Sequence, residues 1–209
     1  MNKKLVTLFA LTGLMLATFG VQAQSLIAGS ADAGEAKALA CTACHGSAGN
    51  SSIPTWPNIA GQNASYILAQ LQAFKNGSRQ DPLMSSQVMT LSDDDMANLA
   101  VYFESLPAAA QSVADAGLVD RGEALYRGGS KKNGTAACLA CHGPTGRGNP
   151  AAKYPALQGQ HAVYTAKQLH DYADGTRTTD GKTRIMRDIA ATLDKDDIAA
   201  LSSYVQGLR

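Results

Sequence analysis

Aromatic side chains make up only 6% of this 209-residue chain. No segment alternates apolar and polar residues as a half-buried β-strand would, and after the first two dozen residues no apolar run is long enough to span a bilayer. The 18 basic and 17 acidic side chains nearly cancel. These absences favour an all-α protein. Because so few aromatic residues can fill a core, small domains of this composition need another source of buried apolar surface.

The four cysteines all lie in two copies of one motif, C-x-x-C-H. Two thiols one helical turn apart can add across the two vinyl groups of a haem, and the adjacent histidine then points its imidazole at the iron. The motif therefore predicts two covalently bound haem c groups, which would also supply much of each core. The predicted residues are Cys41, Cys44 and His45 for the first haem, and Cys138, Cys141 and His142 for the second.

Three other uses of the same cysteines fit their spacing less well. A structural zinc site would need two C-x-x-C pairs much closer together than Cys44 and Cys138, which are 94 positions apart. A redox-active dithiol requires neither the histidine nor a second copy. Two disulfides are common in secreted proteins, but they seldom place both pairs in identical motifs. Haem attachment is the interpretation that accounts for every residue of both motifs.

Residues 1–23 have the pattern of a secretory signal peptide. Lys3 and Lys4 precede an apolar run over residues 5–19, and Val21 and Ala23 supply the small residues that a signal peptidase prefers. An uncleaved anchor helix is the alternative, but the run is short for a span and is interrupted by threonine and glycine. We therefore expect a mature, exported and soluble chain that begins at residue 24.

The mature chain contains two copies of one sequence unit in tandem. The units span residues 24–106 and 120–209, and the alanine-rich segment 107–119 is the predicted linker. Residues 34–36 recur as residues 122–124. At an offset of 98 positions, Pro57, Gly61, Gln62, Tyr66, Gln70, Leu71, Gly77 and Arg79 recur as Pro155, Gly159, Gln160, Tyr164, Gln168, Leu169, Gly175 and Arg177. So many matches at one offset indicate an internal duplication.

Helical periodicity and capping residues predict the helices of both units. A middle helix is expected over residues 65–75, with its counterpart over residues 163–173. A final helix is expected to begin at Ser92 in one unit and at Asp194 in the other, each followed by acidic residues that favour a helix N-terminus. The positions expected to be buried are Met96, Leu99, Ala100, Phe103 and Leu106, and Ile198, Leu201, Val205 and Leu208. A short helix near each C-x-x-C-H motif completes the all-α architecture.

A methionine in each unit is the predicted second iron ligand. Met186 is the only methionine of the second unit, so it is the one thioether available to the second haem. Met186 lies seven residues before Leu193 and Met84 lies seven before Leu91, and each leucine directly precedes a final helix. Internal symmetry therefore selects Met84 for the first haem. Met89 is expected to be a packing residue.

Two histidines of the second unit, His161 and His170, offer an alternative bis-histidine coordination. They align with Asn63 and Gln72, so neither has a counterpart in the first unit. We therefore interpret them as residues of the surface or of the ligands' surroundings rather than as iron ligands.

Two tandem units, each with Pro-x-x-x-Gly-Gln, Tyr-x-x-x-Gln-Leu and a late methionine, resemble the class I c-type cytochromes. Along its whole mature length the chain resembles the dihaem cytochromes c4. The resemblance implies that the carbonyls of Pro57 and Pro155 accept a hydrogen bond from the ligand histidine of their unit, which would hold the imidazole toward the iron. The chain departs from the repeat at residues 128–134, which lengthen the approach to the second motif.

The resemblance also implies a function. Family members carry electrons in the bacterial periplasm and commonly serve a haem–copper terminal oxidase, often while loosely attached to the membrane. We thus expect a periplasmic carrier of single electrons between an upstream quinol-oxidising complex and such an oxidase, with no catalytic residues and no nucleic-acid partner. An iron held by histidine and methionine has no vacant position for a substrate, and the thioether raises its reduction potential.

Two other functions use the same motifs. A dihaem enzyme, such as a peroxidase or a thiosulfate-oxidising cytochrome, would need one haem with an open or unusual ligand, whereas both units here have a matching methionine. An electron-accepting subunit of a dehydrogenase would have the same haem chemistry as a free carrier, so only co-purification separates those two functions.

Charge is distributed unevenly between the units. Residues 24–106 have 3 basic and 7 acidic side chains, whereas residues 120–209 have 13 basic and 9 acidic ones. This polarity predicts oriented docking with partners. Lys182, Arg184 and Arg187 surround Met186 in the sequence and would present a basic surface to an acidic protein or an anionic lipid. The alternative is a merely solvated loop.

Arg79 of the first unit corresponds to Arg177 of the second, and Tyr66 corresponds to Tyr164. The arginines are candidates to offset haem propionates and the tyrosines to contact the haems, with surface and packing roles as the alternatives. We further expect the two domains to pack with their haems close enough for fast electron exchange.

Overall fold

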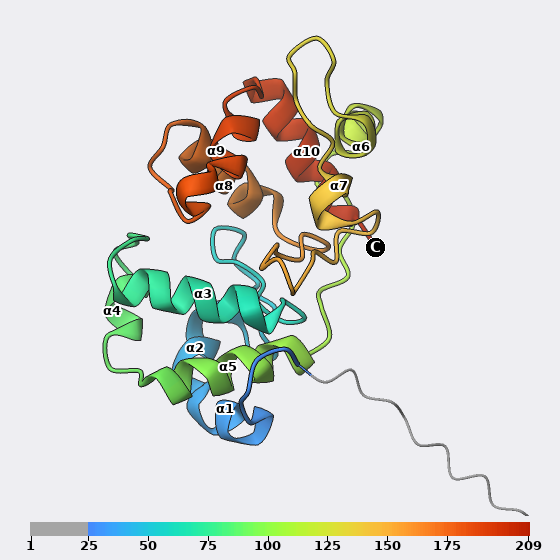
Figure 1. The fold of residues 1–209 in the computed structure, drawn as a ribbon. Helices are drawn as coiled ribbons and strands as arrows, with labels where there is room; N and C mark the ends of the chain where they lie inside the picture. The colour runs from blue at the N-terminus through green and yellow to red at the C-terminus, as the bar shows by residue number, and fades with distance from the viewer. Residues whose placement is uncertain (1–24) are drawn as a thin grey trace, which may run out of the picture.

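The computed structural model describes residues 25–209, so the predicted signal peptide lies outside the described residues. Two helical units lie one above the other and are joined by an extended segment along one side (Figure 1). The helices of residues 31–105 form the lower unit, and those of residues 119–207 form the upper unit. Among the helices described, none combines the length and the apolar character needed to cross a bilayer.

The two units share one order of helices. The first contains α1 (Ala31–Lys37), α2 (Leu39–His45), α3 (Ala64–Lys75), α4 (Met84–Val88) and α5 (Asp93–Ser105). A short 3-10 helix, η1 (Ala116–Leu118), precedes the second unit, which contains α6 (Val119–Gly128), α7 (Leu139–His142), α8 (Ala162–Ala173), η2 (Gly181–Thr183), α9 (Ile185–Ala190) and α10 (Lys195–Gly207). Residues 25–209 form no β-strand, only two isolated bridges, Ser130 with Thr135 and Asn149 with Tyr154. The prediction of an all-α protein with two similar domains is confirmed.

Polar caps set the beginning of the final helix in each unit. Ser92 accepts a hydrogen bond from the Asp95 N–H at 3.0 Å, and the Asp95 carboxylate accepts one from the Ser92 N–H at 3.1 Å. Asp194 and Asp197 form the same reciprocal arrangement before α10. These bonds satisfy N–H groups that have no partner inside the helix. Both final helices therefore begin where predicted, and the middle helices α3 and α8 begin one residue earlier than expected.

Each unit has a small hydrophobic core against its final helix. The buried members are Ala38, Ala64, Ile67, Leu99, Ala100 and Phe103 in the first unit, and Leu125, Tyr126, Leu201, Tyr204, Val205 and Leu208 in the second. The positions predicted to be buried on the final helices are confirmed, except that Leu106 is only half-buried against the first core. Cores of this size are modest for domains of about 90 residues, as the scarcity of aromatic side chains predicted.

The repeated glycines Gly34 and Gly122 lie where two helices cross at close range. α1 packs on α5, and α6 packs on α10. A Cβ at Gly34 would lie 2.2 Å from the Asn98 carbonyl oxygen, and one at Gly122 would lie 2.4 Å from the Ala200 carbonyl oxygen. Because only glycine lets these backbones approach so closely, the residue is required in both copies of the unit.

Gly122→Ala is expected to destabilise the protein by about 1–3 kcal/mol, because the added methyl group must push α6 away from α10. Gly128→Ala is the matched control, since it lies in the same helix and a Cβ there would meet nothing within 4 Å. Thermal unfolding followed by circular dichroism should show a lower melting temperature for Gly122→Ala alone. Equal melting temperatures for the two variants would contradict the close crossing.

Candidate haem centres

Short helices carry both C-x-x-C-H motifs. α2 ends at His45 and α7 ends at His142. Residues three apart on a helix lie on one face, so the two thiols of each motif project from the same side. Cys41 packs against the first core and Cys138 against the second. Each motif is therefore anchored in the apolar interior of its own unit.

The surroundings of the thiols are not those of a redox-active pair or of a zinc site. None of the four cysteines, all of which are described, forms a disulfide. Burial, with a smaller contribution from Cys44, raises the pKa of Cys41, and burial raises the pKa of Cys138 to about 11. Redox-active cysteines have lowered pKa values instead. In residues 25–209, no three histidine, cysteine, aspartate or glutamate side chains come together in a way that could hold a metal ion.

Each predicted histidine ligand is buried and is held by a proline carbonyl. His45 Nδ1 donates to the Pro57 oxygen at 2.8 Å, and His142 Nδ1 donates to the Pro155 oxygen at 3.0 Å. Since a carbonyl can only accept, Nδ1 carries the proton and the Nε2 lone pair is free to bind a metal. Desolvation lowers the pKa of both imidazoles, although the bond to proline opposes this. The hydrogen bonds that the family resemblance implied are confirmed.

The two predicted methionine ligands occupy equivalent places. Met84 is the first residue of α4, which packs on α3. Met186 is the second residue of α9, which packs on α8. Both side chains are half-buried. This equivalence supports the symmetry argument by which Met84 was selected to match Met186.

Met89 does not pack in the core, and the prediction that it would is wrong. It is 60% exposed and lines an open hollow together with Phe74 and Pro82. The residue before it, Val88, is 1% exposed and fills the inward position instead. One step along a helix turns a side chain by about 100°, so two successive residues cannot share the inner face.

The two additional histidines lie in different environments. His161 is buried, and its Nε2 lies 2.9 Å from the Ser51 carbonyl oxygen of the first unit. Its counterpart Asn63 likewise reaches the other unit, donating to the Tyr154 carbonyl oxygen at 2.9 Å. His170 is exposed. His161 is therefore a contact between the units and not a surface residue.

The units join through hydrogen bonds that repeat in both directions, made by the segments directly before α3 and α8. Gln62 accepts from the Ala156 N–H at 2.7 Å and donates to the Ala156 carbonyl at 2.9 Å. Its counterpart Gln160 makes the same two bonds with Asn58, at 2.9 and 2.8 Å. Asn58 and Ala156 directly follow the two prolines that hold the histidines. Each glutamine therefore binds the backbone of the segment whose proline carbonyl holds the histidine of the other unit.

Two equivalent arginines extend this interface. Arg177 donates to the Tyr66 hydroxyl at 2.7 Å and to the Gln70 side chain at 2.9 Å. Arg79 donates in the same way to the Tyr164 hydroxyl at 3.0 Å and to the Gln168 side chain at 2.8 Å. The repeated arginines and tyrosines thus bind each other across the interface, and neither arginine has the purely exposed role that was one alternative.

This interface concentrates positive charge without a carboxylate to balance it. Arg177 is only 5% exposed, and neither arginine forms an ion pair with an aspartate or glutamate of the described residues. Desolvation opposes ionisation of Tyr66, yet Arg177 and Arg79 bring the pKa of its phenol below the ordinary value, as a strong positive potential requires. Buried charge without a partner is costly. The donor set therefore fits a haem, whose propionates would supply the anions.

The sequence did not identify several residues of this interface. Gln62 and Gln160 were recognised only as members of the repeat, and Asn63 only as the counterpart of His161, while Asn58 and Ser51 were not recognised at all. The available signal was position, because Asn58 directly follows the repeated proline. A repeat shows that two residues are equivalent, but it does not show that each binds the partner of the other.

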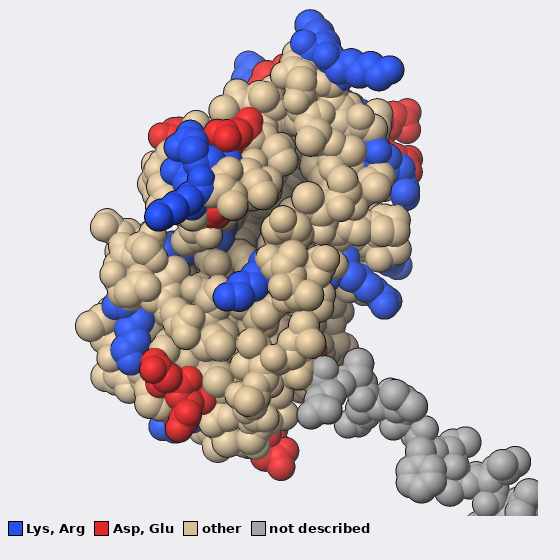
Figure 2. All heavy atoms as spheres, viewed as in Figure 1, with Lys and Arg blue, Asp and Glu red and all other residues tan. Residues whose placement is uncertain are grey.

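The basic surface expected around the second methionine is largely neutralised. Arg184 pairs with Asp188 at 3.2 Å, and Arg187 pairs with Asp180 at 2.8 Å. Lys182 is exposed. In Figure 2, basic side chains are scattered over the upper unit, and acidic ones gather toward the lower end of the first unit. The second unit is still the more basic of the two, but its positive charge does not form a concentrated patch at the loop around Met186.

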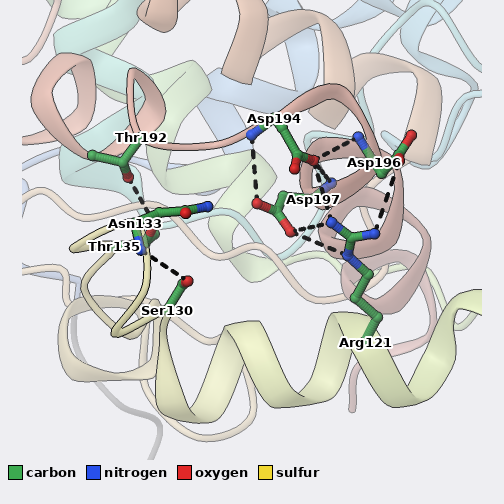
Figure 3. Close-up of polar contacts among 8 residues, drawn as sticks. All are labelled: Arg121, Ser130, Asn133, Thr135, Thr192, Asp194, Asp196 and Asp197. Carbon is green, nitrogen blue, oxygen red and sulfur yellow. Dashed lines mark hydrogen bonds and ion pairs between the residues drawn. The ribbon is translucent and has the colours of Figure 1, made fainter.

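The segment that departs from the repeat forms a hairpin beside α10. Ser130 and Thr135 pair as an antiparallel bridge, and Thr135 Oγ1 lies 2.8 Å from Thr192 Oγ1 (Figure 3). Nearby, Arg121 of α6 binds the carboxylates at the start of α10. The longer approach to the second motif is thus tied to the segment that follows α9.

Comparisons with known proteins agree with this geometry. The family model for cytochrome c matches residues 31–107 and 119–209. Cytochrome c4 of Pseudomonas aeruginosa is 49% identical over 208 residues, covering 100% of both chains. The crystal structure of reduced recombinant cytochrome c4 from Pseudomonas stutzeri superposes with a TM-score of 0.85 at 47% identity, covering 87% of this chain and 100% of that one. A thiosulfate dehydrogenase electron acceptor of Stutzerimonas stutzeri is 35% identical over 80% of this chain and 78% of its own length.

Arg177→Gln is expected to lower a haem reduction potential by roughly tens of millivolts, because loss of a nearby buried positive charge stabilises the oxidised iron. Arg209→Gln removes the same charge from an exposed residue and is the control. Spectroelectrochemical titration of both variants measures the two potentials. Potentials that match the parent in Arg177→Gln would contradict the assignment of the arginines to an anionic cofactor group.

Proposed function

The chain belongs to the cytochrome c family and is a dihaem electron-transfer protein, and on this premise we propose that it carries single electrons in the periplasm. Its donor would be a quinol-oxidising complex and its acceptor a haem–copper terminal oxidase. The observation that best supports a carrier is that both units hold their histidine in the same way, at 2.8 and 3.0 Å from a proline carbonyl. The histidine site is therefore the same in both units, whereas a separate catalytic haem would require one unit to hold its histidine differently.

We propose two complete ligand sets. The attachment residues would be Cys41, Cys44, Cys138 and Cys141, and the iron ligands would be His45, Met84, His142 and Met186. When bound between nitrogen and sulfur, haem iron supplies reversible one-electron chemistry at a raised potential. The chain's part is to fix the geometry. The proline carbonyls keep each Nε2 aimed at the metal, the small cores exclude water, and the buried arginines offer cationic partners for carboxylates.

We also propose domains over residues 24–106 and 120–209, a linker over 107–119, and removal of residues 1–23 on export. Contacts along the linker support this division. Asp115 N–H donates to Ser203 Oγ at 2.7 Å, and Gln206 donates to the Ser112 carbonyl at 2.9 Å. A linker held against the second unit favours a fixed relative position of the domains, which electron exchange between their haems requires.

A second candidate function is electron acceptance from a periplasmic dehydrogenase. The similarity to a thiosulfate dehydrogenase electron acceptor favours it. The haem sites would be unchanged, so the distinction lies in the partner. Stable co-purification with a dehydrogenase from the native host would favour this function, whereas recovery of the chain alone would favour the diffusing carrier, either free or loosely attached to the membrane.

Met84→Ala and Met186→Ala are each expected to remove about half of the sulfur-to-iron absorption of the oxidised protein, because each opens one of two equivalent irons. Met89→Ala is the control, since its side chain is 60% exposed. Visible and near-infrared spectra of the three variants test the assignment. Loss of the band in Met89→Ala, with retention in Met84→Ala, would move the first ligand to residue 89.

Membranes that contain a haem–copper oxidase are expected to reoxidise the reduced protein, and cyanide should stop the reaction by blocking the oxidase. If the charge polarity orients docking, the rate should also change with ionic strength. Stopped-flow absorbance measures both effects, with membranes from an oxidase-deficient strain as the control. Equally fast reoxidation by the deficient membranes would exclude the oxidase as the acceptor.

A further inference from the structure

The loop that leads to Met186 is longer than its counterpart in the first unit. Nine positions separate Arg177 from Met186, whereas five separate Arg79 from Met84. A longer loop has more conformations to lose when it is ordered. Holding Met186 in one place therefore requires contacts that the shorter first loop does not need.

A buried ion pair closes this longer loop. The Asp180 carboxylate accepts the backbone N–H of Arg187 at 3.0 Å and its Nε–H at 2.8 Å, and Arg187 also donates to the Gly181 carbonyl. The side chains of Arg187 and Asp180 are only 14% and 4% exposed. Solvent and salt screen such a pair weakly, and removal of either partner leaves the other buried and unpaired.

Asp180 also replaces a missing helix cap. α9 begins without a side-chain cap at Arg184, whose backbone is left-handed with a φ of 54°. Arg187 is the third residue of α9, so its N–H has no partner inside the helix. By binding this N–H, Asp180 anchors the turn that contains Met186, and its negative charge lies at the favourable end of the helix.

The first unit holds its methionine by a simpler contact. α4 also lacks a side-chain cap at its N-cap residue, and Asp81 accepts the N–H groups of Leu83 and Met84, two and three positions further on, at 3.0 and 2.9 Å. The residue after Met84 is Ser85, which accepts the Asp81 N–H at 3.2 Å. Ser85 directly follows Met84 as Arg187 directly follows Met186, so the first unit has a neutral hydroxyl where the second has a guanidinium in a buried ion pair. The residue directly before Met84, Leu83, is 58% exposed, whereas the residue directly before Met186, Ile185, is half-buried.

We propose that Asp180 and Arg187 are positioning residues for Met186, and that they make the second methionine harder to displace from iron than the first. The inference rests on the proposed function, because it takes Met84 and Met186 as the ligands. The ion pair acts through the backbone, since the loop that it closes contains Met186 one residue before the point of closure.

Displacement of the thioether by imidazole in the oxidised protein, followed through the sulfur-to-iron absorption band, tests this proposal. We expect two phases, and Met84→Ala, which opens the first iron beforehand, should leave only the slow phase. Asp180→Asn, which keeps the side-chain shape, should accelerate the slow phase at least tenfold without changing the fast one. Arg187→Gln should do the same from the other side of the pair. Loss of the second band before imidazole is added, with normal haem content and circular dichroism, would also support the proposal.

Asp188→Asn and Arg184→Gln are the matched controls, because they break an ion pair on the same helix whose side chains are 63% and 55% exposed. Neither control should change either phase. A slow phase that is unaltered in both Asp180→Asn and Arg187→Gln would overturn the proposal, as would equal acceleration by the controls. Failure of the proposed ligand set gives a different result, since Met186→Ala would then leave the absorption band of the second haem in place.

Discussion

The bond from each buried imidazole to a proline carbonyl constrains much of what surrounds it. It sets the proton on Nδ1 and leaves the Nε2 lone pair free to bind a metal. The residue that follows each proline, Asn58 or Ala156, pairs through its backbone with a glutamine of the other unit. One short segment thus serves two purposes. The orientation of a metal ligand and the docking of the two domains are determined by adjacent peptide groups, so neither can shift without the other.

The same interface holds two positive charges that no neighbouring carboxylate balances. Two arginines lie between the units, and their neighbours there are neutral glutamines and tyrosines. Neutral partners satisfy the N–H groups of a guanidinium but do not neutralise its charge. Partial burial of that charge still costs free energy. A cofactor with two carboxylates in each unit would remove that cost. Cofactor binding and association of the domains would then favour each other.

Much of this architecture could be predicted from the sequence, and the failures have physical causes. The helix caps at Ser92 and Asp194, the C-x-x-C-H motifs and the duplication depend on local patterns, which the sequence displays directly. The exposure of Met89 depends on which way a short helix turns, and that is set by packing. The partners of Arg177 depend on how two equivalent halves meet. Spacing along one chain contains no information about that arrangement.

The reciprocal pairing of the halves has a consequence for the origin of the chain. A contact in which residue i of one unit meets residue j of the other, while j meets i in return, is isologous, the self-complementary contact of a twofold homodimer. Gln62 with Ala156 and Gln160 with Asn58 satisfy that rule. Because the contact is self-complementary, the duplicated unit docks on its own copy with a single surface, and the duplication required no second one. Of the differences between the units, the hairpin contacts Thr192 of its own unit, whereas the lengthened loop begins at Arg177 of the shared surface.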